Sequence, residues 1–207
     1  MLTFVINFFM GEIIDIYDDG MNHIGTMDKD EAHRTGQWHK NAHIWIFRRM
    51  PEMQILIQKR TNHGQYPNFW DVAVGGHLTV GDTPYEGAIR EWEEELGIPV
   101  PADFPATHVA INKNRIAAFD PKNPHEPFGE FQYIYLVECD LDITKLNLQE
   151  KEVAAVKWVT ITELEKLFDK ATSLSLIEKG SPQGAREKFV PHTKKYFDTV
   201  LKLLRET

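Results

Sequence analysis

Three glutamates, Glu91, Glu94 and Glu95, have a spacing that could hold a cation. On a helix, residues three and four positions apart lie on one face, so the three carboxylates would point the same way. Like charges repel at that spacing, and the only basic side chain beside them is Arg90, one turn before Glu94. A hard divalent cation such as Mg²⁺ or Mn²⁺ would neutralise them through the oxygen ligands it prefers. Taken alone, however, the spacing favours an ordinary acidic surface that faces solvent.

The longer stretch from Gly75 to Ile98, GGHLTVGDTPYEGAIREWEEELGI, favours the metal site. It resembles the Nudix box: a glycine, five residues, a glutamate, seven residues, and then Arg-Glu-apolar-any-Glu-Glu-any-Gly-apolar. The matching positions are Gly76, Arg90, Glu91, Trp92, Glu94, Glu95, Gly97 and Ile98. The one departure is Asp82, which is shorter than the family's glutamate but is also anionic. A match of this length is far more specific than a lone glycine motif.

The resemblance implies a pyrophosphatase-type enzyme that uses Mg²⁺ or Mn²⁺ to hydrolyse a diphosphate linkage. The expected metal ligands are Glu91, Glu94, Glu95 and the exposed backbone carbonyl of Gly75. Glu91 would be a further ligand or the base that activates water, and Arg90 would orient the carboxylates, so the expected catalytic residues are Glu91, Arg90 and Glu94. The bound metal would neutralise charge on the leaving phosphate and lower the pKa of a water.

The region from Trp38 through the box resembles the isopentenyl-diphosphate isomerase branch of the family. In that branch, histidines and glutamates hold a second metal. The residues closest to those positions are His33, His39, His77 and Glu130. A single histidine is more often structural than a ligand, whereas the group of three makes ligation about equally plausible.

Two departures from the isomerase pattern favour hydrolysis. Gly75 stands where the isomerases carry a catalytic cysteine, and Cys139 is too far along the chain to replace it. Gln132 stands where they carry a second glutamate, and a neutral amide is a poor ligand that cannot act as an acid or base. We therefore expect a hydrolase on an isomerase-like scaffold, with the isomerase as the alternative and a nucleotide-binding sensor that does not cleave as a second one.

Further polar residues are weaker candidates. Lys59 and Arg60 could bind substrate phosphate or could simply end a strand in solvent. Glu150 and Glu152 could supply an extra base or could be exposed loop acids. Substrate specificity is expected to lie in the loops at 62–68 and 119–129.

The elements around these residues predict an α/β (α+β) fold, with a mixed sheet between helices and an N-terminal β-hairpin extension. Apolar runs rich in β-branched residues predict about six core strands. Thr83 and Pro84 predict the start of a helix, and Gly97 predicts its end. Later helices are expected over 161–168 and 193–204. The predicted organisation is an extension at 1–10 and one domain at 11–207, with the hairpin at 11–30, the core at about 38–170 and C-terminal helices at about 171–207.

Composition narrows the partners. The chain has 207 residues, 42% of them apolar, which is enough for a sizeable core. A net charge of −8 argues against a nucleic-acid polymer or an anionic membrane as partner. Cys139 is the only cysteine, which excludes an internal disulfide and suits a reducing cytoplasm. Residues 1–9 are apolar but too short to span a bilayer, and we expect them to pack loosely. The expected partner is a small diphosphate-containing substrate; a homodimer is left open.

Overall fold

The computed structural model describes residues 11–49, 51–116, 127–177 and 188–207. The expected N-terminal extension and residues 119–126 of the second specificity loop lie outside the described residues. The strands are β1 (Ile13–Tyr17), β2 (His23–Asp28), β3 (Trp38–Arg48), β4 (Gln54–Arg60), β5 (Trp70–Val72), β6 (Val74–His77), β7 (Ala110–Ile116), β8 (Phe128–Glu138) and β9 (Val153–Thr160). The helices are α1 (Lys29–Arg34), α2 (Pro84–Leu96), the 3₁₀ turn η1 (Ile143–Lys145), α3 (Ile161–Ile177) and α4 (Lys194–Glu206).

The described strands form one mixed sheet organised around β3. Along one edge, β3 pairs in parallel with β8 from Trp38 to Phe47. Along its other edge it pairs in turn with β1, β6 and β4, all antiparallel. β4 continues the sheet to β5 on one side and β9 on the other. The long apolar runs of β3 and β8 are therefore buried on both faces, as expected for strands in the middle of a covered sheet.

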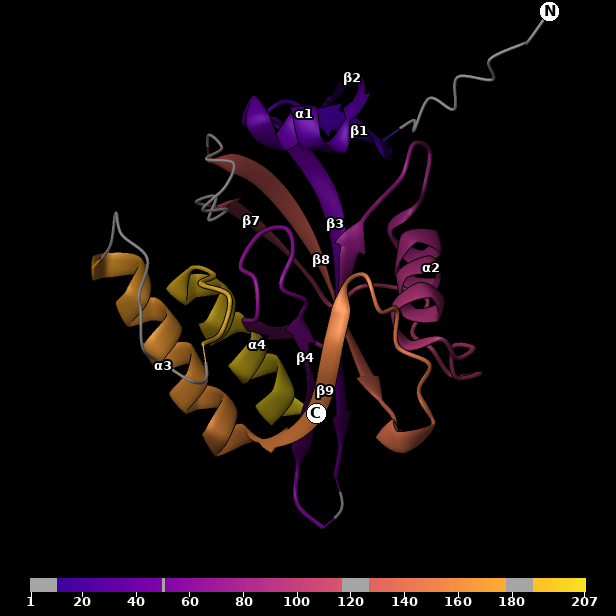
Figure 1. Ribbon diagram of the computed structural model, residues 1–207, viewed down its shortest axis with the longest axis vertical. Coiled ribbons are helices and arrows are strands. Elements are labelled where there is room, and N and C mark those ends of the chain that lie inside the picture. Colours follow the sequence, from indigo (N-terminus) through magenta and orange to yellow (C-terminus); the bar gives the residue numbers. More distant parts are fainter. Residues whose placement is uncertain (1–10, 50, 117–126, 178–187) are drawn as a thin grey trace, which may run out of the picture.

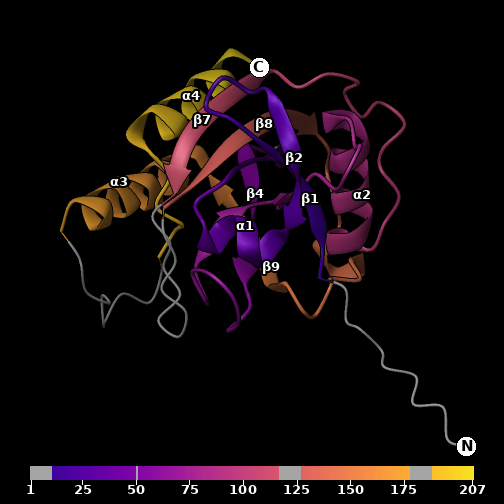
Figure 2. The same ribbon diagram turned by 90° about the horizontal axis from the view of Figure 1, so that it is seen from above.

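Helices cover both faces of the sheet, which confirms the predicted layers. α2 lies on one side and α3 and α4 lie on the other, in both the front view and the view from above (Figures 1 and 2). Trp92 and Leu96 of α2 pack fully buried in one hydrophobic cluster, while Phe197 and Val200 of α4 pack in the other. The sheet thus separates two cores, and the side chains that α2 turns toward the sheet are held firmly.

α2 begins and ends where the sequence predicted. The Thr83 hydroxyl accepts a hydrogen bond from the backbone N–H of Glu86, and the Glu86 carboxylate accepts one from the backbone N–H of Thr83. At the other end Gly97 adopts a left-handed conformation with φ of 65°, which a glycine takes without strain. Both ends of the carboxylate-bearing helix are therefore fixed by the sequence itself.

The N-terminal hairpin is present, and it is followed by a short helix that the sequence did not predict. β1 and β2 pair antiparallel, and the Asp18 side chain stabilises the turn by accepting from the backbone N–H of Gly20. Asp28 then caps α1 through the backbone N–H groups of Asp30 and Glu31. This unit sits at one end of the sheet, above β3 (Figure 1). Its position brings α1 over the ends of the strands that carry the candidate site.

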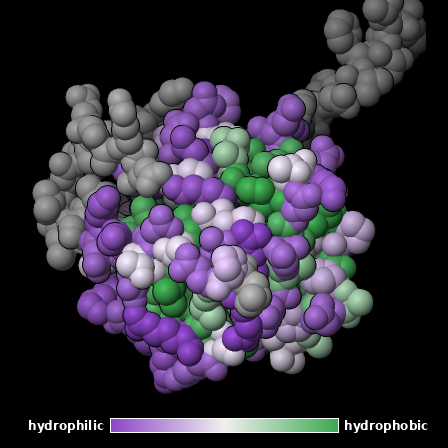
Figure 3. Space-filling model, turned by 90° about the horizontal axis from the view of Figure 1, so that it is seen from below, coloured by the Kyte–Doolittle hydropathy of each residue, from purple (hydrophilic) through white to green (hydrophobic). Residues whose placement is uncertain are grey.

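Hydrophilic residues cover most of the face seen from below, with hydrophobic residues showing between them (Figure 3). Among the described residues, no helix is long and apolar enough to cross a membrane.

Candidate active site

A cavity of about 1170 Å³ opens between α2, the β1–β2–α1 unit and the sheet. Its lining includes the box residues Gly75, Gly76, Arg90, Glu91, Glu94 and Glu95. The volume is above the upper end of ordinary small-molecule sites. The cavity can therefore take a substrate larger than a bare diphosphate.

Two of the three box glutamates are buried in the wall of this cavity. Glu91 is 6% exposed and Glu95 is 2% exposed, whereas the side chain of Glu94 is 47% exposed. Glu95 accepts hydrogen bonds at its Oε2 from the backbone N–H of Gly75 and from Nε2 of Gln58, both at 3.2 Å. Glu95 is therefore fixed between α2 and the sheet, while Glu94 lies at the cavity's outer edge.

Arg90 ties the carboxylates to the strand that precedes the helix. Its guanidinium donates to Oε1 of Glu91 at 2.8 Å and to the backbone carbonyl of His77 at 2.6 Å. Longer contacts of 3.4 Å and 3.3 Å reach Glu94 and Asp82. Asp82 therefore contacts the same arginine even though it is shorter than the glutamate of the box pattern.

Burial makes the two inner carboxylates costly to ionise. Burial raises the pKa of Glu91 to about 7, against the opposing effect of Arg90, and burial together with the charge of Glu91 raises the pKa of Glu95 well above its usual value. Arg90 pairs with Glu91, whereas the hydrogen-bond donors to Glu95 are the neutral Gln58 and Gly75, so the pair has a deficit of positive charge. A divalent cation that prefers oxygen ligands fits this donor set.

Gly76 is needed for close approach rather than for a special backbone angle. A Cβ at this position would overlap the carboxylate of Glu91. At the neighbouring Gly75, a Cβ would meet only Val72 closely, at 3.1 Å. The first box glycine therefore makes room for the Glu91 carboxylate beside β6.

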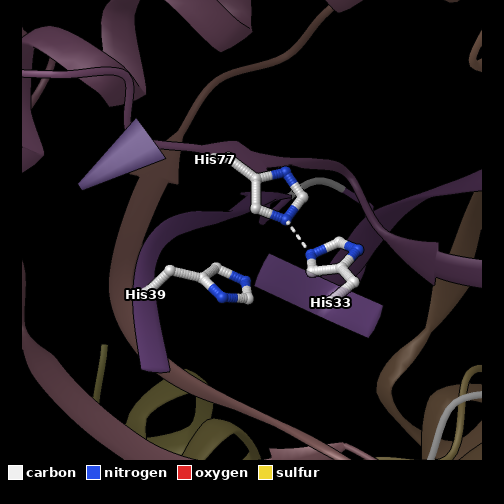
Figure 4. A group of neighbouring side chains, drawn as sticks. All are labelled: His33, His39 and His77. Atoms are coloured by element: carbon white, nitrogen blue, oxygen red, sulfur yellow. Dashed lines mark hydrogen bonds between the residues drawn. The ribbon is translucent and has the colours of Figure 1, made fainter. Parts of the chain in front are cut away.

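A second group of possible ligands lies at the end of the cavity next to α1. Nitrogen atoms of His33, His39 and His77, from α1, β3 and β6, all lie within 4.8 Å of one another (Figure 4). Nε2 of His33 is 3.1 Å from Nε2 of His77. Nδ1 of His39 donates to the carbonyl of Gln37 at 3.3 Å, which leaves the lone pair on Nε2. That buried Nε2 has no hydrogen-bond partner among the described residues, and an imidazole-binding cation fits it.

Glu130 completes this histidine cluster from β8. Its Oε1 lies 3.8 Å from Nε2 of His39, which is too long for a hydrogen bond, and its Oε2 accepts from Nε2 of Gln132 at 2.7 Å. Glu130 therefore adds a carboxylate beside the histidine cluster, and Gln132 holds it without adding a second charge.

The structure brings most of the predicted site residues to one cavity but not all. Arg60 and Glu152 line it, whereas Lys59 and Glu150 are not among its lining residues. His39 is not among them either, because it is fully buried behind the cavity wall. Arg60 donates to Asp71 at 3.1 Å, so its guanidinium faces the cavity rather than solvent alone.

Several lining residues were missed by the sequence analysis. They are Lys29, Asn41, His43, Asp71, Val190 and His192. Tyr66 and Phe128, which also line the cavity, lie within the two loops that were expected to carry specificity. Asn41 and His43 offered a signal, because they are polar residues within an otherwise apolar strand. Asp71 and His192 offered none, because they are 121 positions apart and meet only through tertiary structure.

His43 predicts a dependence of stability on pH. Burial, with a smaller effect of His192, lowers the pKa of His43 to about 4 from an ordinary 6.5. The folded state therefore keeps the ring neutral while the unfolded state takes up a proton. Stability from this group is present above pH 6.5 and falls as the pH drops toward 4, by about 3 kcal/mol in all.

The measurement is the free energy of unfolding in urea between pH 8 and pH 4, with EDTA present. The variant His43→Gln, which cannot take up this proton, is expected to show a shallower decline than the unmodified protein. Parallel curves for the two proteins would contradict this assignment.

Comparison with known proteins agrees with this geometry. The family model described as "NUDIX domain" matches residues 38–178. An uncharacterized Nudix hydrolase of Clostridium acetobutylicum is 30% identical over 209 residues, which cover 94% of this chain and 98% of that protein. Nudix hydrolase 3 of Arabidopsis thaliana is 31% identical over 143 residues, covering 69% of this chain but only 18% of the plant protein.

An isopentenyl-diphosphate Delta-isomerase of Photorhabdus laumondii is 26% identical over 165 residues, which cover 78% of this chain and 85% of that enzyme. This match is consistent with the isomerase-like branch. Among solved structures, DR0079 of Deinococcus radiodurans superimposes with a TM-score of 0.55 at 19% identity, over 94% of this chain and 98% of the other. That likeness shows a shared fold. The matched family model and the full-length Clostridium relative show that the chain belongs to the Nudix hydrolase family, whose members act on diphosphate bonds.

Proposed function

We propose that this protein is a divalent-metal-dependent hydrolase that cleaves the diphosphate linkage of a small nucleoside diphosphate derivative or a related compound. The observation that carries the proposal is the buried pair Glu91 and Glu95, held by Arg90, Gln58 and Gly75 in the wall of a large cavity. Such a pair is costly to bury in a purely structural role, because each carboxylate loses its hydration.

The proposed ligands of the catalytic metal are Glu91, Glu94, Glu95 and the carbonyl of Gly75, with Mg²⁺ or Mn²⁺ as the ion. When bound, the metal supplies charge neutralisation for the diphosphate and a lower pKa for water. Arg90 occupies Oε1 of Glu91, so Oε2 is the atom through which Glu91 takes the proton from the attacking water. Arg90 itself stays bound to the carbonyl of His77 and keeps the helix in register with the strand.

Three further cations among the lining residues are the proposed phosphate-binding groups. Arg60 and Lys29 line it from the strand β4 and from the start of α1, and Lys151 lines it beside Glu152. Lys29 pairs with Glu12 at 2.5 Å, which holds its ammonium in place. In the proposed reaction these groups bind the diphosphate electrostatically, and Glu152 is the candidate for an additional base.

The proposed second metal site is His33, His39, His77 and Glu130, with a role in binding or positioning substrate. The expected result is that Mn²⁺ or Zn²⁺, added to protein freed of metal, raises the melting temperature, because these residues join α1, β3, β6 and β8. His33→Asn should lose most of that increase. The matched control is His23→Asn, an exposed histidine of the same N-terminal unit that pairs with Asp15; an equal loss in both variants would count against the site.

The test of the proposed function is ³¹P NMR of the protein with Mg²⁺ and a panel of nucleoside diphosphates, dinucleotides, nucleotide sugars and isopentenyl diphosphate. New phosphate or nucleoside monophosphate signals are the expected result, and they name the substrate class. A panel that stays unchanged, with intact ligands bound to the protein, would instead support a sensor that binds without cleaving.

The second candidate function is isopentenyl-diphosphate isomerisation, which the histidine cluster with Glu130 favours. It is disfavoured by Gly75, which offers no thiol, and by Gln132, whose amide donates to Glu130 and cannot transfer a proton. Proton NMR of the isoprenoid sample separates the two functions. A new allylic isomer with unchanged phosphorus signals would establish the isomerase.

A further inference from the structure

A group of buried polar side chains lines the same cavity apart from the box and the histidine cluster. Asp71 and His192 are 6% and 5% exposed, and His43 beside them is also 5% exposed. His192 comes from the segment that leads into α4, beyond the residues that match the family model. A parallel bridge between Trp70 and Phe189 joins that segment to β5. The C-terminal part of the chain therefore supplies one wall of the cavity.

Asp71 fixes the hydrogen-bonding state of His192. Its carboxylate accepts from Arg60 at 3.1 Å and from the backbone N–H of Val72 at 2.9 Å, and its Oδ1 lies 3.4 Å from Nε2 of His192. A carboxylate held by these donors is ionised, and despite burial the hydrogen bond with His192 lowers the pKa of Asp71. Nε2 of His192 is thus the donor, and Nδ1 carries the lone pair.

The lone pair on Nδ1 of His192 is only weakly used. The nearest donor is Nε2 of Gln132 at 3.4 Å, and that amide has a shorter bond, 2.7 Å, to Glu130. Gln132 is held on its other side by Asn112, whose Nδ2 donates to Oε1 at 2.7 Å. The Asp71–His192 pair is therefore oriented by its neighbours. A ligand hydroxyl that donates to Nδ1 of His192 would replace the long contact with Gln132, whose amide keeps its shorter bond to Glu130.

An apolar wall lies next to this polar pair. Tyr66, Phe128 and Val190 line the cavity and form one small hydrophobic cluster together with Phe69. Phe128 also joins this wall to the histidine cluster, because one face of its ring stacks on His33 at 4.2 Å between ring centroids. A polar pair beside an apolar wall suits a sugar ring, which has carbon faces and hydroxyl edges.

We propose that Asp71 and His192, with the wall of Tyr66, Phe128 and Val190, form a subsite for the hydroxyl-bearing sugar of the substrate. The inference rests on the proposed function and, within it, favours a diphosphate that carries a sugar over one that carries an isoprenoid chain. An isoprenoid chain in this subsite would remove water from Asp71 and His192 and replace none of its hydrogen bonds. Sites built to bond a hydroxyl reject analogues that lack it for this reason.

The test compares two five-carbon monophosphates, ribose 5-phosphate and isopentenyl monophosphate, by isothermal titration calorimetry with Mg²⁺ and the full chain. Neither has a diphosphate bond, so binding is measured independently of hydrolysis. The unmodified protein is expected to bind ribose 5-phosphate at least about tenfold more tightly. No preference for the sugar would overturn the proposal.

Three variants locate the preference. His192→Phe should bring the ratio of the two dissociation constants close to one, and His192→Gln, whose amide can still donate to Asp71, should restore part of it. His108→Phe is the matched control, because His108 contacts Tyr133 and Tyr135 and is not among the cavity's lining residues. An unchanged ratio in His192→Phe, or an equal loss in His108→Phe, would overturn the assignment.

The outcomes also separate this inference from the proposed function. A sugar preference that depends on His192, with no hydrolysis of any diphosphate, would keep the subsite and remove the hydrolase. Hydrolysis without a sugar preference would keep the hydrolase and remove the subsite.

Discussion

Glu95→Gln is expected to lower turnover by at least about 100-fold while leaving the fold intact. The substitution keeps the size of the side chain and removes its charge. Glu95 is 2% exposed and bound by Gln58 and the backbone of Gly75, so the amide remains in place but no longer offers a second anionic oxygen to a cation. The measurement is release of product from the best substrate of the ³¹P NMR panel.

A stability measurement distinguishes this loss from misfolding. Burial raises the pKa of Glu95 well above its usual value, so the charged form destabilises the metal-free protein at pH 8. Without metal, Glu95→Gln should therefore melt at a higher temperature than the unmodified protein, and Mg²⁺ should no longer raise its melting temperature.

The matched control for Glu95 is Glu93→Gln, an exposed glutamate on the same helix. It should keep both its activity and the response of its melting temperature to Mg²⁺. Full turnover in Glu95→Gln, or an equal loss in Glu93→Gln, would contradict the assignment of the metal site.

Gly76→Ala is expected to reduce turnover by about 100-fold, whereas Gly75→Ala should change it less than about threefold. At Gly76 an added Cβ overlaps the carboxylate of Glu91, which must leave its position beside Arg90. At Gly75 the added atom meets Val72 at 3.1 Å, and a small shift of that side chain accommodates it. The alanine keeps the backbone carbonyl that is the proposed ligand.

The two alanine variants are best compared by kcat and by the concentration of Mg²⁺ that gives half-maximal activity. In Gly76→Ala, displacement of Glu91 should lower kcat and raise the concentration of Mg²⁺ that gives half-maximal activity. Equal losses in the two variants would mean that the glycines are needed for the conformation of β6 and not for the position of the Glu91 carboxylate.

The local parts of this structure could be predicted from the sequence, because local signals determine them. Thr83, Pro84 and Gly97 fix the ends of α2 through capping and a left-handed turn, which depend on neighbouring residues alone. The hairpin follows in the same way from Asp18 and Gly20. By contrast, α1 has only six residues and no apolar periodicity, and its N-cap Asp28 looks like any loop acid in the sequence.

The candidate site was predictable only where a motif gathers residues along the chain. Glu91 and Glu95 follow from the box, and the three histidines from the resemblance to the isomerases. Asp71 and His192 could not be predicted as neighbours, because they are brought together by tertiary pairing. β5 pairs with β4 along one edge, and its Trp70 forms a bridge with Phe189 along the other. Gln58 could not be predicted either, because its role depends on the packing of α2 over β4, which brings Glu95 within reach of its amide.

The bridge between Trp70 and Phe189 has a consequence for the timing of synthesis. A nascent chain that has just completed β9 already contains α2, the box carboxylates and the histidines, and it can form most of the sheet. It has not yet made His192 or α4, whose Val200 and Leu204 are buried in the second core. The cavity therefore gains the wall that contains His192 only when the C-terminal segment leaves the ribosome, after the box carboxylates and the histidines have already been made.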